Sequence, residues 1–189
     1  MNRFQKLALV TLTTALGLVT IGVVVRATDA GLGCPDWPFC YGRLLPPADD
    51  PKAWIEWVHR TVAAVIGFEI VGLAILALRD HRRRPSIVWP TIAAVGLVGF
   101  QAWLGRETVR LGNSGESVTA HLAAAMLLVG LLVYLAVRAG YPASLAARGA
   151  TQRFTLVAAF GAAVTLQSTR HSAAHNLITT SIGRCARED

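Results

Sequence analysis

The sequence predicts an all-α membrane protein: a polytopic four-helix bundle with a cytoplasmic N-terminus, followed by a short fifth apolar segment and a polar tail. Charged residues make up only 15% of the chain, whereas soluble domains contain about 25%. Four apolar runs are each long enough to cross about 30 Å of hydrocarbon as a helix. Basic residues collect between these runs, as in proteins whose charges set membrane topology.

The four runs are continuous and show no strand-like alternation of apolar and polar residues. They cover residues 7–25, 54–78, 87–104 and 117–137, and a fifth run at 154–166 is too short to span. Because lipid offers the backbone no hydrogen-bond partners, only helices and closed barrels cross a membrane. Continuous runs therefore favour helices.

These runs divide the chain into three predicted parts. Residues 1–138 form the four-helix membrane bundle, with an outer loop at 26–53. Residues 139–153 form a cytoplasmic loop, and residues 154–189 hold a truncated fifth segment and a charged tail.

The basic residues predict the orientation in a bacterial-type inner (plasma) membrane. The side with more of them is expected to be cytoplasmic. These residues are Arg3, Lys6, Arg79, Arg82, Arg83, Arg84, Arg138, Arg148 and Arg153. The net charge of +7 does not indicate nucleic acid, because no basic stripe is interleaved with aromatic residues. Tryptophans near the opposite side are typical of an interfacial aromatic belt. They are Trp37, Trp54, Trp57 and Trp103.

His59 and His121 are the strongest candidates for a functional site. A histidine inside a spanning helix is a functional candidate by default. Each lies near the outer end of its run, roughly 6–8 Å below the edge, and the two runs are predicted to be parallel. The pair suits two axial ligands of one haem iron in a bundle core. The alternative is that each histidine hydrogen-bonds a neighbouring helix.

Two charged residues flank His59. Glu56 precedes it by three residues, which places both on one helix face. Its carboxylate could orient the imidazole, move protons or stabilise positive charge, or it could be an interfacial residue. Arg60 could pair with a haem propionate, or with Glu56 or a lipid phosphate. Glu69, in mid-span, has no evident partner in the sequence.

Cys34 and Cys40 bracket a proline-rich turn in the outer loop. Prolines at this spacing favour a Cα approach of ~5–6 Å, and the loop is predicted to lie on the oxidising side. The sequence therefore predicts a disulfide. A zinc site would need more ligands nearby, and a thioredoxin-like pair would use a two-residue spacer.

Together these residues give the chain a resemblance to the haem A synthase family of cytochrome oxidase assembly. The similar stretches are RATDAGLGCPDWPFC at 26–40, EWVHR at 56–60, QAWLGRETV at 101–109 and TAHL at 119–122. The resemblance runs from the N-terminus to about residue 137, and more faintly to 166. That family folds as two similar four-helix halves, so the resemblance implies that this chain carries the first.

The resemblance also implies roles for the candidate residues. Glu56 resembles the family's catalytic glutamate, and His59 and His121 resemble the paired ligands at the haem O substrate site. Cys34 and Cys40 resemble the outer-loop disulfide of many bacterial members. The family oxidises the C8 methyl of haem O to a formyl group, giving haem A. Its second half usually binds a haem b cofactor through another histidine pair.

The sequence departs from the family after residue 166. The family pattern calls there for a long fifth helix and a second glycine-rich outer loop, which this chain lacks. His171 and His175 have no apolar run around them and are expected to be solvated, and Cys185 stands alone. Two interpretations follow: a truncated or frame-disrupted gene product, or a short four-helix relative that self-associates.

The leading functional prediction is a haem A synthase-like membrane oxidoreductase. Its expected partners are membrane lipid, haem O, a haem O synthase, an electron donor and a second copy of the chain. The first alternative is a non-catalytic bis-histidine haem protein that carries electrons or haem. The second is a structural or assembly subunit without haem. Glu56 favours the enzyme, because an electron carrier needs no carboxylate one turn from its ligand.

Overall fold

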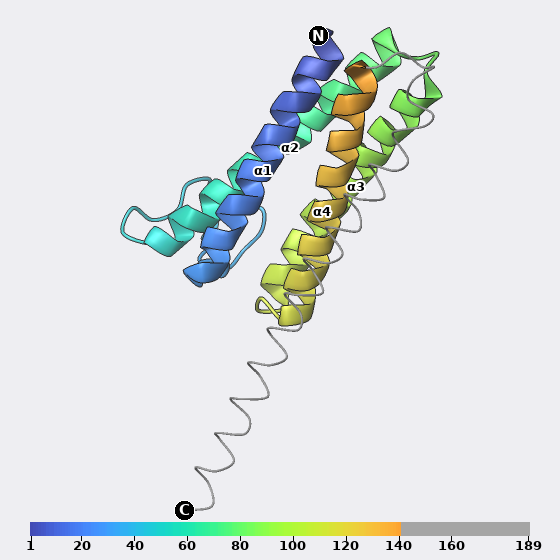
Figure 1. Cartoon of the computed structure of the whole chain (residues 1–189). Coiled ribbons are helices and arrows are strands. Elements are labelled where there is room, and N and C mark those ends of the chain that lie inside the picture. The colour runs from blue at the N-terminus through green and yellow to red at the C-terminus, as the bar shows by residue number, and fades with distance from the viewer. Residues whose placement is uncertain (141–189) are drawn as a thin grey trace, which may run out of the picture.

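The computed structural model describes residues 1–140, which form four long helices (Figure 1). The helices are α1 (Arg3–Ala27), α2 (Pro51–Asp80), α3 (Pro85–Arg110) and α4 (Gly115–Gly140). All four are long and apolar enough to cross a membrane, with mean hydropathies of 2.3, 2.4, 1.6 and 2.3 over their apolar windows. The predicted all-α, polytopic bundle is therefore confirmed. The predicted fifth segment at 154–166 and the tail, with His171, His175 and Cys185, lie outside the described residues.

Capping residues explain where the helices begin. The Asn2 side chain accepts a hydrogen bond from the Gln5 backbone N–H at 2.7 Å, and Asp50 Oδ1 accepts one from Ala53 N–H at 3.1 Å. Pro51 opens α2, where its missing N–H is no loss. The loop between α1 and α2 therefore covers residues 28–50, and is shorter at both ends than the predicted 26–53. We call it the α1–α2 loop.

Successive helices run in opposite directions, so α2 and α4 are parallel to each other (Figure 1). The N-terminus and the α2–α3 turn lie at one end of the bundle. The α1–α2 loop and the α3–α4 turn lie at the other, which we call the loop end. The membrane side that the loop end faces stays a prediction from the basic residues.

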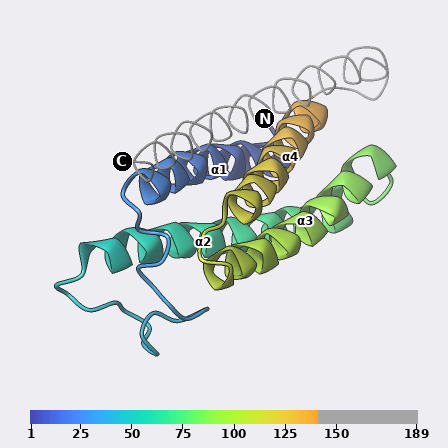
Figure 2. The ribbon, with the colours of Figure 1, turned by 90° about the horizontal axis from the view of Figure 1, so that it is seen from below.

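Each helix packs against two neighbours. The pairs in contact are α1 with α2, α2 with α3, α3 with α4 and α4 with α1. Figure 2 gives the view from below, in which the α1–α2 loop extends beyond the helices. Because α2 and α4 are not in the contacting pairs, they occupy diagonal corners of the bundle.

The apolar core fills the half of the bundle away from the loop end. Its largest fully buried side chains come from the start of α1 and α3, from the C-terminal part of α2 and from the second half of α4: Phe4, Ile70, Leu73, Ile87, Leu132 and Leu135. Outward-facing side chains are also apolar, as expected where helices face lipid rather than water; Phe68 is 78% exposed and Trp89 is 70% exposed. The half near the loop end is thus left for the polar residues.

Candidate functional site

The two candidate histidines lie in the loop-end half of the bundle, on its diagonal helices. His59 is the ninth residue of α2 and His121 the seventh of α4, so they lie about 12 Å and about 9 Å along their helices. Both are half-buried, and they are near enough to interact electrostatically. Because α2 and α4 occupy diagonal corners, the two histidines lie on opposite sides of the bundle interior.

A glycine from a neighbouring helix lies beside each imidazole. A Cβ built on Gly22 of α1 would lie 3.5 Å from His59 Cε1, and one built on Gly105 of α3 would lie 3.5 Å from His121 Cε1. The helix surface next to each ring is therefore bare backbone. No side chain therefore projects from either glycine toward the ring, and a residue larger than glycine would place atoms against the imidazole.

Both histidines have an enclosed nitrogen without a hydrogen-bond partner within the described part of the chain. This is Nδ1 in His59 and in His121, whereas the Nε2 atoms are not among the enclosed, unpartnered atoms. The predicted alternative, in which each histidine hydrogen-bonds a neighbouring helix, is therefore not seen at Nδ1. Buried polar groups are normally paired, so an unpaired ring nitrogen in each of two histidines inside the bundle calls for a functional explanation.

Glu56, one turn nearer the loop end than His59, forms a buried ion pair with Arg60, the residue that follows His59. Arg60 Nε donates to Glu56 Oε1 at 2.8 Å, and the two side chains are 14% and 7% exposed. Of the partners weighed from the sequence for Arg60, the structure therefore shows Glu56. Glu56 shares its helix with His59, but its bond is to the arginine.

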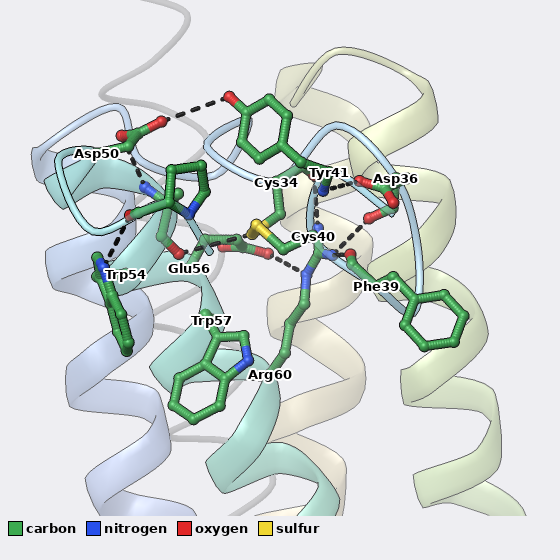
Figure 3. The surroundings of a disulfide bond; sticks show 12 residues. Cys34, Asp36, Phe39, Cys40, Tyr41, Asp50, Trp54, Glu56, Trp57 and Arg60 are labelled. Carbon is green, nitrogen blue, oxygen red and sulfur yellow. Dashed lines mark hydrogen bonds and ion pairs between the residues drawn. A yellow bond between two sulfur atoms is a disulfide. The ribbon is translucent and has the colours of Figure 1, made fainter. Parts of the chain in front are cut away.

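Arg60 also binds the backbone of the α1–α2 loop (Figure 3). Its Nη1 donates to the carbonyls of Asp36 at 2.6 Å and Phe39 at 3.0 Å, and its Nη2 donates to the carbonyl of Cys34 at 2.9 Å. These bonds and the one to Glu56 use four of the five N–H groups of a guanidinium. At most one N–H then remains for a haem propionate, and that contact stays a prediction.

The predicted disulfide between Cys34 and Cys40 is confirmed, with a Cα–Cα distance of 4.6 Å. Both cysteines are fully buried against Ala53. A tight turn follows the ring, in which the backbone N–H of Cys40 donates to the Arg43 carbonyl at 3.0 Å and that of Arg43 donates to the Cys40 carbonyl at 3.1 Å. The loop around the disulfide is therefore a fixed structure on the start of α2.

Asp36 holds this turn closed. Its carboxylate accepts the backbone N–H of Gly42 at 2.7 Å and that of Tyr41 at 2.6 Å. These bonds, with the one from Gly42 contributing most, lower the pKa of Asp36 below its usual value of 3.8. Tyr41 and Gly42 have positive φ values of 54° and 68°, which is typical of such turns.

Two of the tryptophans predicted to form an aromatic belt have a more specific role. The indole N–H of Trp57 donates to the Leu44 carbonyl at 2.7 Å, and that of Trp54 donates to the Pro47 carbonyl at 3.0 Å. Both therefore bind the second half of the α1–α2 loop to α2. Trp37 and Trp103 are 43% and 52% exposed, which agrees with a place at an interface.

Two further polar residues of the interior have incomplete hydrogen bonding. Gln101 continues the buried stripe of α3 and lies one turn from Gly105, yet its Oε1 is enclosed without a partner within residues 1–140. Glu69 Oε1 accepts a bond from Thr14 Oγ1 at 3.3 Å, while its Oε2 is enclosed and unpartnered there. From the sequence, Gln101 stood out only as part of the stretch at 101–109, and Glu69 had no evident partner.

The fold and the site together define a class: multi-pass membrane proteins with a histidine pair inside a helical bundle, next to a buried Glu–Arg pair. Residues 5–169 match the COX15-CtaA family, described as cytochrome oxidase assembly protein. The chain belongs to this family, as the resemblance implied.

Individual relatives are similar over the same region. The chain is 32% identical to a heme A synthase of Shewanella oneidensis over 146 residues, which cover 68% of this chain and 43% of that protein. It is 36% identical to a heme A synthase of Geobacillus kaustophilus over 118 residues, 62% and 37% of the two chains. The chain thus spans less than half the length of these relatives, and matches their N-terminal part.

Proposed function

We propose that this chain binds haem O between His59 and His121 and takes part in oxidising its C8 methyl group to a formyl group, as a haem A synthase-like oxidoreductase. The observation that carries the proposal is the pair of half-buried histidines on diagonal helices, each with a glycine of a neighbouring helix beside its ring. Membership of the family directs the choice of ligand to a haem of the haem A pathway.

The residues fit a haem better than a bare metal ion. Within residues 1–140, no group of three His, Cys, Asp or Glu side chains could hold a metal. A zinc site would need at least a third protein ligand, whereas the iron of a haem takes only axial ligands from the protein. A flat macrocycle between α2 and α4 also suits two helices that are diagonal neighbours and do not pack directly side by side.

Glu56 is the proposed catalytic residue. Oxidation of a methyl group releases protons and builds positive charge, and a buried carboxylate nearby can accept a proton or stabilise that charge. Its bond to Arg60 fixes one oxygen, so the other is the one available to the ligand.

The wider context of the reaction is also part of the proposal. The multi-pass fold places the protein in lipid, and we assign it to a bacterial inner membrane with the N-terminus in the cytoplasm. Haem O synthase, an electron donor and a second copy of the chain are the proposed partners. The described residues offer one histidine pair inside the bundle, which we assign to the substrate; the haem b of the family resemblance has no assigned site within them.

One observation favours a second candidate function. The Glu56 carboxylate is tied to Arg60, which is also what a purely structural glutamate would do. The chain would then be a non-catalytic bis-histidine haem protein that carries electrons or haem. Both candidates need the histidine pair, and they differ in whether the bound haem is changed.

The test is a visible absorption spectrum of the purified protein, together with haem extraction from cells that make haem O. We expect a six-coordinate haem spectrum that is lost in His59→Ala and in His121→Ala. His81→Ala is the matched control, because His81 caps α2 at the other end and packs edge-on against Phe4 at 5.4 Å. Unchanged spectra in both site variants would remove the haem proposal. Haem A in the wild type but not in Glu56→Gln supports the enzyme, and a bound but unchanged haem in the wild type supports the carrier.

A further inference from the structure

Arg60 joins two parts of the site that the sequence separates. Its guanidinium holds Glu56 on one side and three backbone carbonyls on the other, from Cys34, Asp36 and Phe39. All three carbonyls belong to residues 34–40, the segment that the disulfide closes into a ring. Figure 3 shows the guanidinium between the disulfide ring and the carboxylate.

The disulfide is what brings these carbonyls together. Carbonyls of an open chain would converge on one cation at a greater cost, because each residue would lose backbone freedom to point its oxygen inward. The covalent ring, the Asp36 bonds to the turn and the burial of both cysteines remove that freedom before Arg60 binds. The ring therefore acts as a preformed acceptor for a planar cation.

An arginine suits this position better than a lysine. A guanidinium offers five N–H donors in a fixed plane, whereas an ammonium is a compact point charge with three. Here four donors are used at once, in two directions. Hydrogen bonds from a charged donor are also stronger than neutral ones, so the geometry of Glu56 is tied firmly to that of the ring.

We propose that Arg60 is a positioning residue that couples the disulfide-closed ring to Glu56, so that opening the ring releases the carboxylate. Without the ring, three donors of a buried cation lose their acceptors, and the side chain turns to find others. Its bond to Glu56 is then lost or redirected. The functional consequence rests on the proposed role of Glu56, but the coupling itself does not.

The experiment measures access to the Glu56 carboxyl group rather than turnover. A hydrophobic carbodiimide is added to the full chain in detergent, and labelled carboxyl groups are mapped by mass spectrometry. In the wild type Glu56 is shielded, since its side chain is 7% exposed and one oxygen is occupied. Glu69, on the same helix and away from the ring, is the internal reference.

Four variants are compared: Arg60→Lys, the double variant Cys34→Ser/Cys40→Ser, the combined variant with all three substitutions, and Arg106→Lys as a control. Arg106 pairs with Glu107 near the loop end but is half-exposed, so its replacement leaves the ring intact. We expect Arg60→Lys and the cysteine variant each to raise Glu56 labelling roughly tenfold, about what the loss of one charge-assisted hydrogen bond gives. The combined variant should label no faster than either, because both remove the same link.

Other results would overturn the proposal. If the cysteine variant labels Glu56 at the wild-type rate, the ring does not act on the carboxylate. If the two effects multiply in the combined variant, they are independent. Should the cysteine variant lose its helical circular dichroism, reducing the disulfide of the folded wild type with a phosphine makes the same comparison, and unchanged Glu56 labelling there refutes the coupling. Because the readout needs neither haem nor product, its failure leaves the haem proposal standing.

Discussion

Gly105 gives the sharpest test of how closely α3 approaches the histidine ring. A Cβ at this position would lie 3.5 Å from His121 Cε1, which is ordinary van der Waals contact. Gly105→Ala should therefore fit without moving the ring. Because glycine inside a helix is less favourable than alanine by about 0.5–1 kcal/mol, we expect the free energy of unfolding to rise by that amount.

Gly105→Leu should have the opposite effect on ligand binding. Carbon atoms attract best at about 3.5–4.0 Å, and the Cβ alone already fills that gap. The next carbons must then overlap the imidazole or push it away. Overpacking of this kind costs about 1–3 kcal/mol, which corresponds to a roughly 5- to 150-fold weaker binding constant.

The assay is a haem titration of the ligand-free protein, followed by the Soret band, with thermal unfolding of each variant alongside. Gly99→Leu is the matched control, because Gly99 lies on the same helix and no atom lies within 4 Å of its built Cβ. If Gly105→Leu binds haem as tightly as Gly99→Leu, His121 does not bind the ligand from the position described.

Three other predictions concern single side chains. Gln101→Met removes an enclosed, unpaired oxygen and keeps a side chain of similar length. The free energy of unfolding of the ligand-free protein, measured by thermal unfolding, should therefore rise by about 1 kcal/mol, and a fall would mean that the oxygen is paired. Trp57→Phe keeps the ring but loses the bond to the Leu44 carbonyl, and amide exchange in the α1–α2 loop should rise by up to roughly tenfold, with unchanged exchange as the contrary result. The folded protein lowers the pKa of Asp36, so the ionised carboxylate stabilises the loop at neutral pH. This stabilisation is lost as the pH falls from 3.8, the usual pKa, through the lower pKa of the folded state. We expect tryptophan fluorescence to change over this pH range in the wild type and not in Asp36→Asn.

The helices could be predicted from the sequence because a spanning helix leaves a strong local signal. Each run is long, apolar and continuous. Successive spanning helices cross the membrane in opposite directions, so the order of the runs along the chain gives the direction of each helix. That alternation makes α2 and α4 parallel, which is why His59 and His121 could be assigned to one depth. The disulfide was predictable for a similar reason, since Cys34 and Cys40 are neighbours in sequence around a turn.

The partners of these residues were not predictable, because they depend on tertiary packing. Nothing local in the sequence says that Gly22 meets His59, or that Arg60 reaches the carbonyls of a loop more than twenty residues away. Trp57 was read as part of a belt because an indole at an interface has the same pattern whether it faces lipid or donates to a loop. Gln101 did leave a signal, since spacings of three and four residues put it on the stripe of Thr91 and Ala94.

The site depends on both helix hairpins. The first hairpin, α1 and α2, supplies Gly22 and His59, and the second, α3 and α4, supplies Gly105 and His121. Each hairpin thus contributes one glycine and one histidine ring, so the proposed haem site would need both hairpins. At the loop end the hairpins meet directly: a Cβ on Gly31 would lie 2.5 Å from Asn113 Nδ2, so the α1–α2 loop sits against the α3–α4 turn. Because that contact lies on the same loop as the disulfide ring, the element that holds Arg60 also joins the two hairpins at the loop end.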